Sequence, residues 1–413
     1  MATVSYHAWP LVAWPAAAHR RIIARGTRVI VVTGSFGKTT SARAIVTALG
    51  GEPRHDISRN AKFFVARALL RIRPGQPHAV IEIGIIRRNE MAEYARIVRP
   101  DVAVVTSIGS EHNRSLGSLE VTRDEKAHLV RALPVTGTAV LNGDDPNVRW
   151  MKSQTRARVR TFGFGEANDV RAGSPVLDWP RGMRFSVSTP AGSREARVQL
   201  MGRPMVYPIL AALTVALEEG VSLDRALDAL AILEPTPGRL QPVSLANGAI
   251  VLRDDFKSAQ ETIEAALDLL GEIPAKRRIA VLGDVSEPVG AQGPIYRHLG
   301  QRVAEVASRA VFLTGSNVSA YMAGAKKGGM PAEAMVNAHG RVQEAIEALK
   351  DDLGPGDVVL VKGRDTQHLA RITLGLAGRH VGCELTACDV KIRCERCPML
   401  ESGWGTRSVR GLG

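Results

Sequence analysis

Short apolar runs alternate with longer amphipathic stretches along most of the chain, and this alternation predicts the fold. In the first half, the runs that read as strands are residues 28–32, 78–84, 101–109 and 137–143. The stretch 40–50 places Ala42, Ile45 and Leu49 on one helical face, and Gly50 is a typical C-terminal stop. Strands separated by helices favour a parallel sheet with crossover helices.

The pattern changes in the middle of the chain and then restarts. Residues 155–200 contain shorter alternating runs, which suggest a small antiparallel excursion. Helical stretches follow at 207–220 and 222–233, and residues 234–242 carry three prolines and one glycine, which is typical of a linker. Further strand-like runs then follow at 249–256, 278–284, 310–315 and 357–363. The sequence therefore predicts two α/β domains, each with its own sheet.

The composition is ordinary for a globular protein: 413 residues, 45% hydrophobic and 23% charged, with a net charge of +13. Aromatic residues make up only 4% and no long arginine–lysine tract occurs, so we expect no nucleic-acid partner. No run approaches the ~18 apolar residues that a membrane helix needs. The apolar stretch 8–18 contains two prolines, which does not fit a membrane-spanning helix. Basic residues follow this stretch instead of preceding it, which does not fit a signal peptide. We expect a cytoplasmic protein with, at most, a peripheral N-terminal anchor.

One candidate for chemistry is the stretch 31–40, VVTGSFGKTT, which reads as a strand end, a tight turn and a helix start. Gly34 and Gly37 allow the backbone N–H groups to point at a phosphate, and the helix N-terminus adds partial positive charge. Lys38 supplies a cation and Thr39 a hydroxyl for magnesium. The longer phosphate-loop pattern needs a glycine five positions before Gly37, which is absent here. Taken alone, the motif fits a simple glycine turn equally well.

Two further residues occur at the ends of neighbouring predicted strands. Glu82 lies in an apolar run, where an unpaired carboxylate is costly, and His112 lies in the loop after the next strand. Each alone is unremarkable, since a loop histidine is usually just solvated. The carboxyl ends of parallel strands meet at one edge of a sheet, where such folds bind ligands. Together with the loop, these residues indicate a site for a nucleotide and magnesium.

At this point the sequence resembles the Mur ligase family of ATP-dependent amide-bond ligases. The segments that carry the resemblance, in the family's order and spacing, are TGSFGKTT at 33–40, EIG at 82–84, RPDVAVVTSIGSEH at 99–112, VLNGDDP at 140–146, PGR at 237–239, DDF at 254–256 and GDVVLVKG at 356–363. The segments VLGDVSEPVG and VKGR look most like the branch that adds D-Ala-D-Ala to the muramoyl tripeptide.

The resemblance implies an α/β fold of defined parts. These are an N-terminal extension (1–27), a central ATP-binding domain like that of phosphate-loop NTPases (28–238), a Rossmann-like C-terminal domain (239–380) and a short cysteine-rich tail (381–413). It also implies ATP and two magnesium ions as cofactors, and a carboxylate and an amine as substrates.

The resemblance further implies a role for particular residues. The loop that holds the phosphates is Gly34, Ser35, Phe36, Gly37, Lys38, Thr39 and Thr40. Magnesium is expected at Thr39, Glu82 and His112. Asn60, Asn142 and Arg239 are expected to contact nucleotide, and Asp255 is expected to be the acid that the C-terminal domain contributes on closure. Lys126 matches a lysine that many members carbamylate; without the resemblance it reads as an exposed helix lysine.

The implied activity is ATP-dependent activation of a carboxylate as an acyl phosphate, followed by attack of an amine. Two alternatives stay open: an NTPase or phosphotransferase that uses the same loop, and a nucleotide-binding subunit that has lost catalysis. The substrates are expected to be non-standard, because few residues precede the first strand and leave no room for the family's UDP-sugar domain. The stretch FKSAQET, at 256–262, also places Lys257 and Ser258 where relatives carry other groups.

All four cysteines lie close together near the C-terminus, at Cys383, Cys388, Cys394 and Cys397. Four thiols that end in a Cys-x-x-Cys pair fit a tetrahedral zinc site or an iron–sulfur cluster. Disulfide bonds are one alternative, but the expected cytoplasmic location argues against them. Free thiols are the simplest alternative. Because this tail lies beyond the family resemblance, it is also a candidate surface for a partner protein or an unusual substrate.

Overall fold

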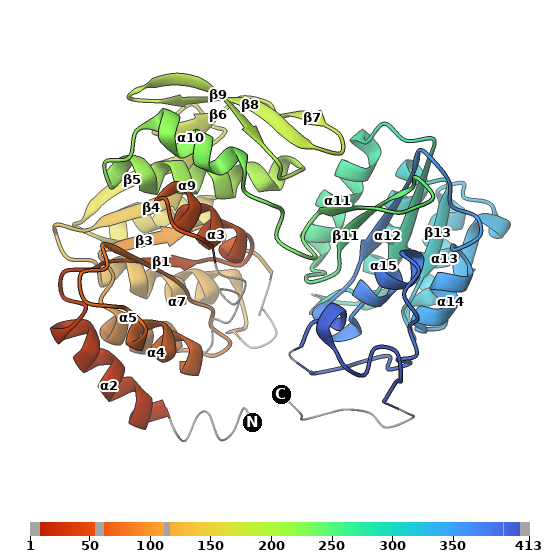
Figure 1. The fold of residues 1–413 in the computed structure, drawn as a ribbon, viewed down its shortest axis with the longest axis horizontal. Helices are drawn as coiled ribbons and strands as arrows, with labels where there is room; N and C mark the ends of the chain where they lie inside the picture. The colour runs from red at the N-terminus through yellow and green to blue at the C-terminus, as the bar shows by residue number, and fades with distance from the viewer. Residues whose placement is uncertain (1–8, 54–61, 111–115, 289, 391, 405–413) are drawn as a thin grey trace. The chain divides into compact units, whose positions relative to one another are not determined.

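The structure is a computed structural model, and it describes residues 9–53, 62–110, 116–288, 290–390 and 392–404. The described chain divides into two compact units (Figure 1). The first extends to residue 234 apart from 179–181, and the second comprises those three residues and the chain from 235 onward. Each unit has its own sheet, as the hydrophobic pattern predicts.

The sheet of the first unit is parallel over most of its width. Its strands are β1 (Arg28–Thr33), β2 (His78–Glu82), β3 (Val102–Val105), β4 (Thr138–Asn142), β5 (Arg158–Gly163), β6 (Val170–Ala172), β7 (Val176–Asp178), β8 (Gly182–Thr189) and β9 (Gly192–Val198). Parallel pairing runs through the order β2-β1-β3-β4-β5-β6, and β8 then pairs antiparallel with β6, β7 and β9. The antiparallel part is the excursion predicted for 155–200.

Helices cover both faces of this sheet, as crossover connections require. The described helices of the unit are α2 (Trp9–Ile22), α3 (Lys38–Ala48), α4 (Lys62–Leu70), α5 (Glu90–Val98), α7 (Leu119–Arg131), α8 (Pro146–Arg149), η1 (Trp150–Gln154), η2 (Arg203–Met205), α9 (Val206–Glu218) and α10 (Leu223–Ala231). One core joins the sheet to α3, α9 and α10, and the other joins it to α2, α4, α5 and α7.

Helix α2 is an element that the sequence pattern does not predict. Its residues Trp9, Ala13 and Ala16 are buried in the core beneath α4 and α5, and Trp9 packs edge-on against Tyr94 at 5.8 Å between ring centres. The buried Arg20 pairs with Asp101 at 2.7 Å. Residues 9–27, the described part of the predicted N-terminal extension, therefore pack as part of the first unit. None of the described helices is long and apolar enough to cross a membrane.

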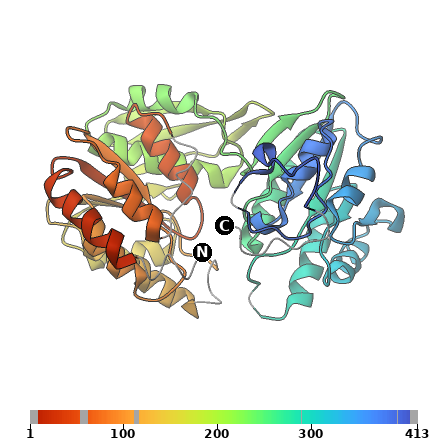
Figure 2. The same cartoon turned by 60° about the horizontal axis from the view of Figure 1, so that its bottom comes forward.

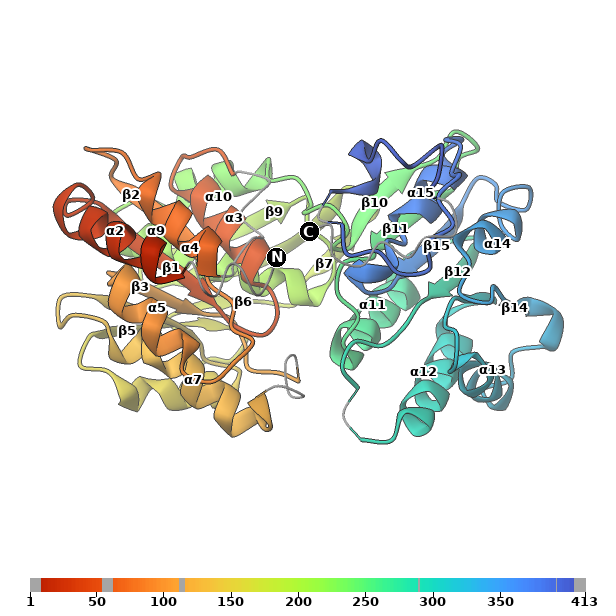
Figure 3. The ribbon, with the colours of Figure 1, turned by 90° about the horizontal axis from the view of Figure 1, so that it is seen from below.

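The sheet of the second unit is also mainly parallel, with the order β10-β11-β15-β12-β13-β14 and only β10 antiparallel to its neighbour. Its elements are β10 (Gln241–Ser244), β11 (Ile250–Asp254), α11 (Gln260–Glu272), β12 (Arg277–Leu282), α12 (Gln292–Val306), β13 (Arg309–Phe312), α13 (Val318–Lys327), η3 (Ala332–Ala334), β14 (Met335–Asn337), α14 (Val342–Glu347), β15 (Asp357–Lys362), η4 (Asp365–Gln367), α15 (Ala370–Leu376) and η5 (Cys394–Arg396). Helices α14 and α15 cover one face, and α11, α12 and α13 lie on the other (Figure 3).

The cysteine-rich tail folds back onto the second unit, where it appears in dark blue in Figure 2. Val381, Cys394 and Leu400 form a small core with Ala370 of α15. The fully buried Arg371 donates to the carbonyl oxygens of Cys383, at 2.8 Å, and Leu385, at 2.6 Å. These contacts make the described part of the tail a packed segment.

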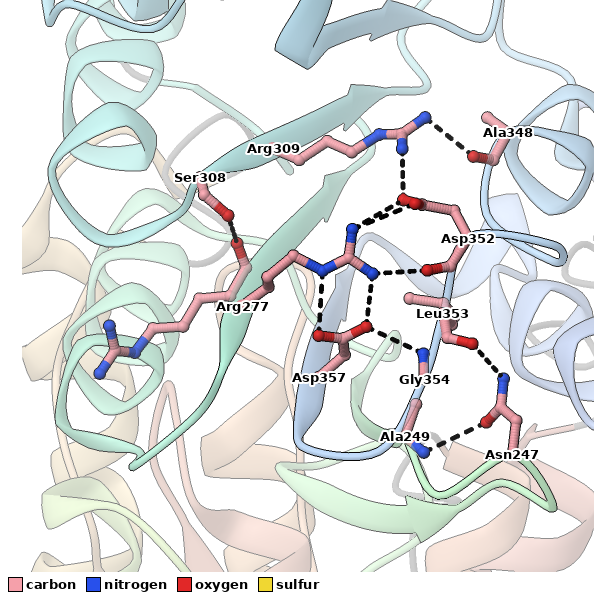
Figure 4. Close-up of polar contacts among 11 residues, drawn as sticks. Asn247, Ala249, Arg277, Ser308, Arg309, Ala348, Asp352, Leu353, Gly354 and Asp357 are labelled. Atoms are coloured by element: carbon pink, nitrogen blue, oxygen red, sulfur yellow. Dashed lines mark hydrogen bonds and ion pairs between the residues drawn. The ribbon is translucent and has the colours of Figure 1, made fainter.

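The strands of the second sheet are joined at their amino ends by an ion-pair network (Figure 4). Arg277, which begins β12, donates from Nε to Asp357 at 3.0 Å and from its terminal nitrogens to Asp352 and Asp357. Asp357, which begins β15, also accepts the Gly354 N–H at 2.9 Å. These bonds, above all those from Arg277, lower the pKa of Asp357 below its ordinary value.

We expect Asp357→Asn to destabilise the second unit by about 2 kcal/mol at pH 7, because hydrogen bonds to a charged group are lost from a buried position. Since the carboxyl has a lower pKa when folded, its stabilising contribution is fully present above its ordinary pKa of 3.8 and is lost as the pH falls through the lowered pKa of the folded state. Urea unfolding at pH 7 and pH 3 measures this: the difference between the variant and the parent should be smaller at pH 3 than at pH 7. An equal difference at both pH values would contradict the assignment.

Candidate active site

The phosphate-loop candidate is a tight connection between β1 and α3, and its glycines are required by the backbone. Gly34 has φ +149° and Gly37 has φ +80°, conformations that other residues rarely adopt. A Cβ at Gly34 would lie only 1.9 Å from Oγ1 of Thr106. Space and backbone conformation together therefore demand glycine at position 34, which a simple surface turn would not.

The loop is bonded to the segment that follows β3. The Ser35 N–H donates to the Ser107 carbonyl at 2.8 Å, and the Phe36 N–H donates to Oγ of Ser107 at 2.9 Å. Oγ1 of Thr106 donates to the Phe36 carbonyl at 2.5 Å. Thr106 and Ser107 lie within one of the family motifs, but they are not among the site residues predicted from the sequence. Their position at the carboxyl end of the strand beside β1 was the signal that could have done so.

Lys38 lies at the start of α3 with its charge buried against the loop. Its Nζ donates to the carbonyl oxygens of Gly34, at 2.7 Å, and Ser35, at 2.9 Å. Thr39 and Thr40 follow in the first turn of the helix and are also buried. A buried ammonium beside a helix N-terminus concentrates positive charge, which favours a bound phosphate.

Lys126 is brought to the same loop by α7. It is 1% exposed, and its Nζ lies 3.4 Å from Oγ of Ser35. The reading of Lys126 as an exposed helix lysine is therefore wrong. The loop is thus contacted at Ser35 by two buried lysines, Lys38 at the carbonyl oxygen and Lys126 at the hydroxyl.

We expect Lys126→Ala to lower the kcat of ATP hydrolysis or ligation by about 100-fold, because a buried charge in a preorganised site contributes several kcal/mol to transition-state stabilisation. Lys62 is a suitable control, since its Nζ lies 3.1 Å from a carboxylate oxygen of Glu93. Steady-state kinetics of both alanine variants tests this, and equal losses in the two would contradict a role for Lys126.

The other candidates of the first unit lie at the same sheet edge or outside the described residues. Glu82 is the last residue of β2, is 4% exposed and pairs in register with Val32 of β1. Asn142 ends β4 and donates from its amide to the Thr106 carbonyl at 2.8 Å. Asn60 and His112 fall outside the residues that the structure describes.

The second unit holds Arg239 and Asp255 near the carboxyl end of β11. The Arg239 guanidinium lies 4.7 Å from the centre of the Phe256 ring, and Oδ1 of Asp255 lies 3.0 Å from Nε of Arg253. Gly238 is close to the acid, since a Cβ there would lie 2.6 Å from Oδ1 of Asp255. The acid is therefore held in a defined position within its own unit.

A buried pair next to Asp255 was missed by sequence reasoning. Nζ of Lys362 donates to Asp254 at 2.5 Å and to the Lys257 carbonyl at 2.7 Å. Burial raises the pKa of Asp254 and lowers the pKa of Lys362. The pair links β11 to β15 at the residue that precedes the predicted acid.

The four cysteines are free, with Cys383 and Cys394 buried and the other two partly buried. Burial raises the pKa of the Cys394 thiol to about 12 and also raises the pKa of Cys388, so both are protonated at neutral pH. Sγ of Cys394 lies 3.3 Å from Nδ1 of His368. Within the described part of the chain, no three His, Cys, Asp or Glu side chains are grouped to hold a metal ion, so the metal prediction gains no support here.

Comparison with known proteins gives a consistent result for both units. Residues 32–216 match the model of the Mur ligase middle domain, and residues 238–364 match that of the Mur ligase, glutamate ligase domain. A UDP-N-acetylmuramoyl-tripeptide–D-alanyl-D-alanine ligase from Mycobacterium bovis is 30% identical over 377 residues, which cover 85% of this chain and 73% of the relative. The enzyme of the same name from Escherichia coli is 31% identical over 269 residues, and the match spans 64% of this chain and 59% of that enzyme.

Solved structures agree on the fold. MurF from Acinetobacter baumannii superposes with a TM-score of 0.78 at 24% identity, covering 90% of this chain and 81% of that chain. MurF from Thermotoga maritima, solved in complex with ADP, gives a TM-score of 0.75 at 20% identity, covering 89% and 82%. With two family models matched in order over most of its length, the chain belongs to the Mur ligase family of ATP-dependent amide ligases.

Proposed function

We propose that this protein activates a substrate carboxylate as an acyl phosphate, using ATP, and couples it to the amine of an amino acid or peptide. The observation that carries the proposal is the glycine-dependent loop at 34–37, with the ammonium group of Lys38 and the buried side chain of Lys126 packed against it. Such an arrangement suits the transfer of a γ-phosphoryl group, because catalysis of this step depends mainly on positioning and on neutralising the charge of the phosphoryl oxygens.

In the first step the substrate carboxylate attacks the γ-phosphorus, the bond from phosphorus to the β,γ-bridging oxygen breaks, and ADP leaves. Nζ of Lys38 donates to the carbonyl oxygens of Gly34 and Ser35, which places its charge within the loop that would hold the phosphate oxygens. In the second step the amine attacks the acyl carbon, inorganic phosphate leaves, and the amine loses a proton. The acyl phosphate must be kept from water until then.

Magnesium fits the residues at this edge of the first unit. Thr39 supplies a hydroxyl and Glu82 a buried carboxylate, and hard oxygen donors are the ligands that magnesium prefers. When bound, magnesium would neutralise phosphate charge during the transfer. Thr39 and Glu82 are the described residues that we propose to hold it.

For the substrates, the named relatives suggest UDP-N-acetylmuramoyl-tripeptide and D-alanyl-D-alanine as the first pair to test. We propose that this chain uses a different amine, because Lys257 and Ser258 occupy the segment after Phe256. Oγ of Ser258 is buried and has no hydrogen-bond partner among the described residues. An unsatisfied buried hydroxyl is costly unless a ligand pairs with it.

The test is release of ADP and phosphate from MgATP with a matrix of carboxylates and amines that includes this pair. The proposal predicts release that requires both partners and product mass equal to their sum minus water. Phosphate release without an amine would instead indicate an NTPase, transfer to a hydroxyl would indicate a phosphotransferase, and nucleotide binding without turnover would indicate a subunit that has lost catalysis.

A further inference from the structure

The cysteine-rich tail contacts the residues that hold the predicted acid. Glu395, in η5, pairs with a terminal nitrogen of Arg253, and Nε of the same guanidinium lies 3.0 Å from Oδ1 of Asp255. The chain of contacts runs from the tail through one arginine to Asp255. Glu395 lies beyond residues 238–364, which match the family model, so this contact comes from the part of the chain outside that model.

These three groups are shielded enough for their charges to interact strongly. The side chains of Asp255 and Arg253 are 4% and 11% exposed, and that of Glu395 is 29% exposed. Burial alone would lower the pKa of Arg253, but Asp255 and Glu395 raise it. Burial alone would likewise raise the pKa of Glu395, but Arg253 holds it below its ordinary value. Arg253 and Glu395 are therefore charged at neutral pH, and the carboxyl groups of Asp255 and Glu395 share one guanidinium.

The tail holds Glu395 in place by contacts that do not involve the ion pair. Arg379 donates to the Glu395 carbonyl oxygen at 3.1 Å, and the preceding Cys394 contacts His368. Leu400 is buried against α15. Because the backbone of η5 is fixed independently, Glu395 can hold the guanidinium of Arg253 at one end while Asp255 contacts it at the other.

We propose that Glu395 is a positioning residue for Asp255 and that the tail is thus a working part of the ligase. This inference rests on the proposed function and on the expectation that Asp255 is the acid that the C-terminal domain contributes to it. With Glu395 present, Arg253 is shared between two carboxylates. Without its charge, the guanidinium is free to turn fully toward Asp255, which would neutralise that carboxylate and change its orientation.

The experiment compares Glu395→Gln with Glu384→Gln in the full chain. Glu384 is the control, because it is also a carboxylate of the tail and its side chain is exposed. We expect Glu395→Gln to lower kcat about tenfold with the KM for ATP within twofold of the parent, since small displacements of positioned groups cost this much or more. Glu384→Gln should leave both constants unchanged. The substrates are MgATP and the pair that supports turnover in the matrix.

A second measurement does not depend on turnover. Hydrogen exchange of the amides in residues 250–258 should become at least about threefold faster in Glu395→Gln and stay unchanged in Glu384→Gln, because local opening follows the loss of the restraining contact. Unchanged exchange in both variants, or equal losses of kcat in both, would overturn the positioning role. If the parent protein turns over no substrate pair but exchange responds as expected, then the proposed function fails and the structural coupling stands.

Discussion

Replacing Lys38 by alanine is expected to abolish ATP turnover, with kcat/KM at least about 1,000-fold below that of the parent, because the charge that neutralises the transferring phosphoryl group is lost. The position of the Lys38 side chain explains this expectation. Nζ of Lys38 lies at the centre of the loop, bonded to the carbonyl oxygens of Gly34 and Ser35. No flexible surface lysine could replace a cation held in this position.

Lys152→Ala is the control for this prediction, since Lys152 is exposed in η1 of the same unit. Both variants should unfold at denaturant midpoints close to that of the parent, so that the loss is assigned to the site and not to the fold. Steady-state ADP release measures the effect. Turnover in Lys38→Ala within tenfold of the parent would contradict the phosphate-loop assignment.

Gly34→Ala is expected to have the second large effect, a loss of nucleotide affinity of at least about 100-fold, because the added Cβ cannot fit without moving the loop. It would lie 1.9 Å from Oγ1 of Thr106 and 3.0 Å from the backbone nitrogen of Ser107. Thr106 also donates to the Phe36 carbonyl, so its movement would disturb the loop further. Calorimetric titration with MgADP measures the affinity directly.

Gly75→Ala separates the clash from the general cost of a left-handed residue. Gly75 has φ +76°, and a Cβ there would meet nothing within 4 Å. We expect this control to lose about 1 kcal/mol of stability while binding nucleotide normally. If Gly34→Ala also binds MgADP like the parent, then the loop does not hold the phosphates.

The hydrophobic pattern was sufficient to predict the strands that are buried along their whole length. The strands at the centre of each sheet are buried on both faces and so appear as continuous apolar runs; β3 and β15 are the clearest cases, with every residue buried. The turn at Gly34 and Gly37 could be predicted because glycine and lysine occur there at a spacing that reflects their chemical role.

Helix α2 could not be predicted in the same way. Its sequence contains Pro15 and has apolar residues on both faces: Trp9 and Ala16 are buried, while Leu11 and Trp14 are 77% and 79% exposed. A helix that is apolar all round has no periodic signal, and the internal proline argues against a helix. Only its packing beneath α4 and α5 defines it.

The surroundings of the candidate site residues also could not be predicted from their neighbours in the sequence. Lys126 is in a helix whose sequence is largely charged, and nothing near it in the chain indicates that it is 1% exposed. Its Nζ contacts Ser35, which is 91 residues away in the sequence. Glu395 and Arg253 are 142 residues apart, so their pairing likewise depends on the tertiary fold.

The most direct test of the account is the path of oxygen during the reaction. With both oxygens of the substrate carboxylate labelled with ¹⁸O, an acyl phosphate mechanism transfers one of them to phosphorus, because the carboxylate oxygen becomes the bridging atom and leaves with the phosphate. Mass spectrometry of the released phosphate should therefore find one ¹⁸O atom in each molecule formed with amide product. Phosphate that carries no label, while amide forms, would contradict the proposed activation of the carboxylate by ATP.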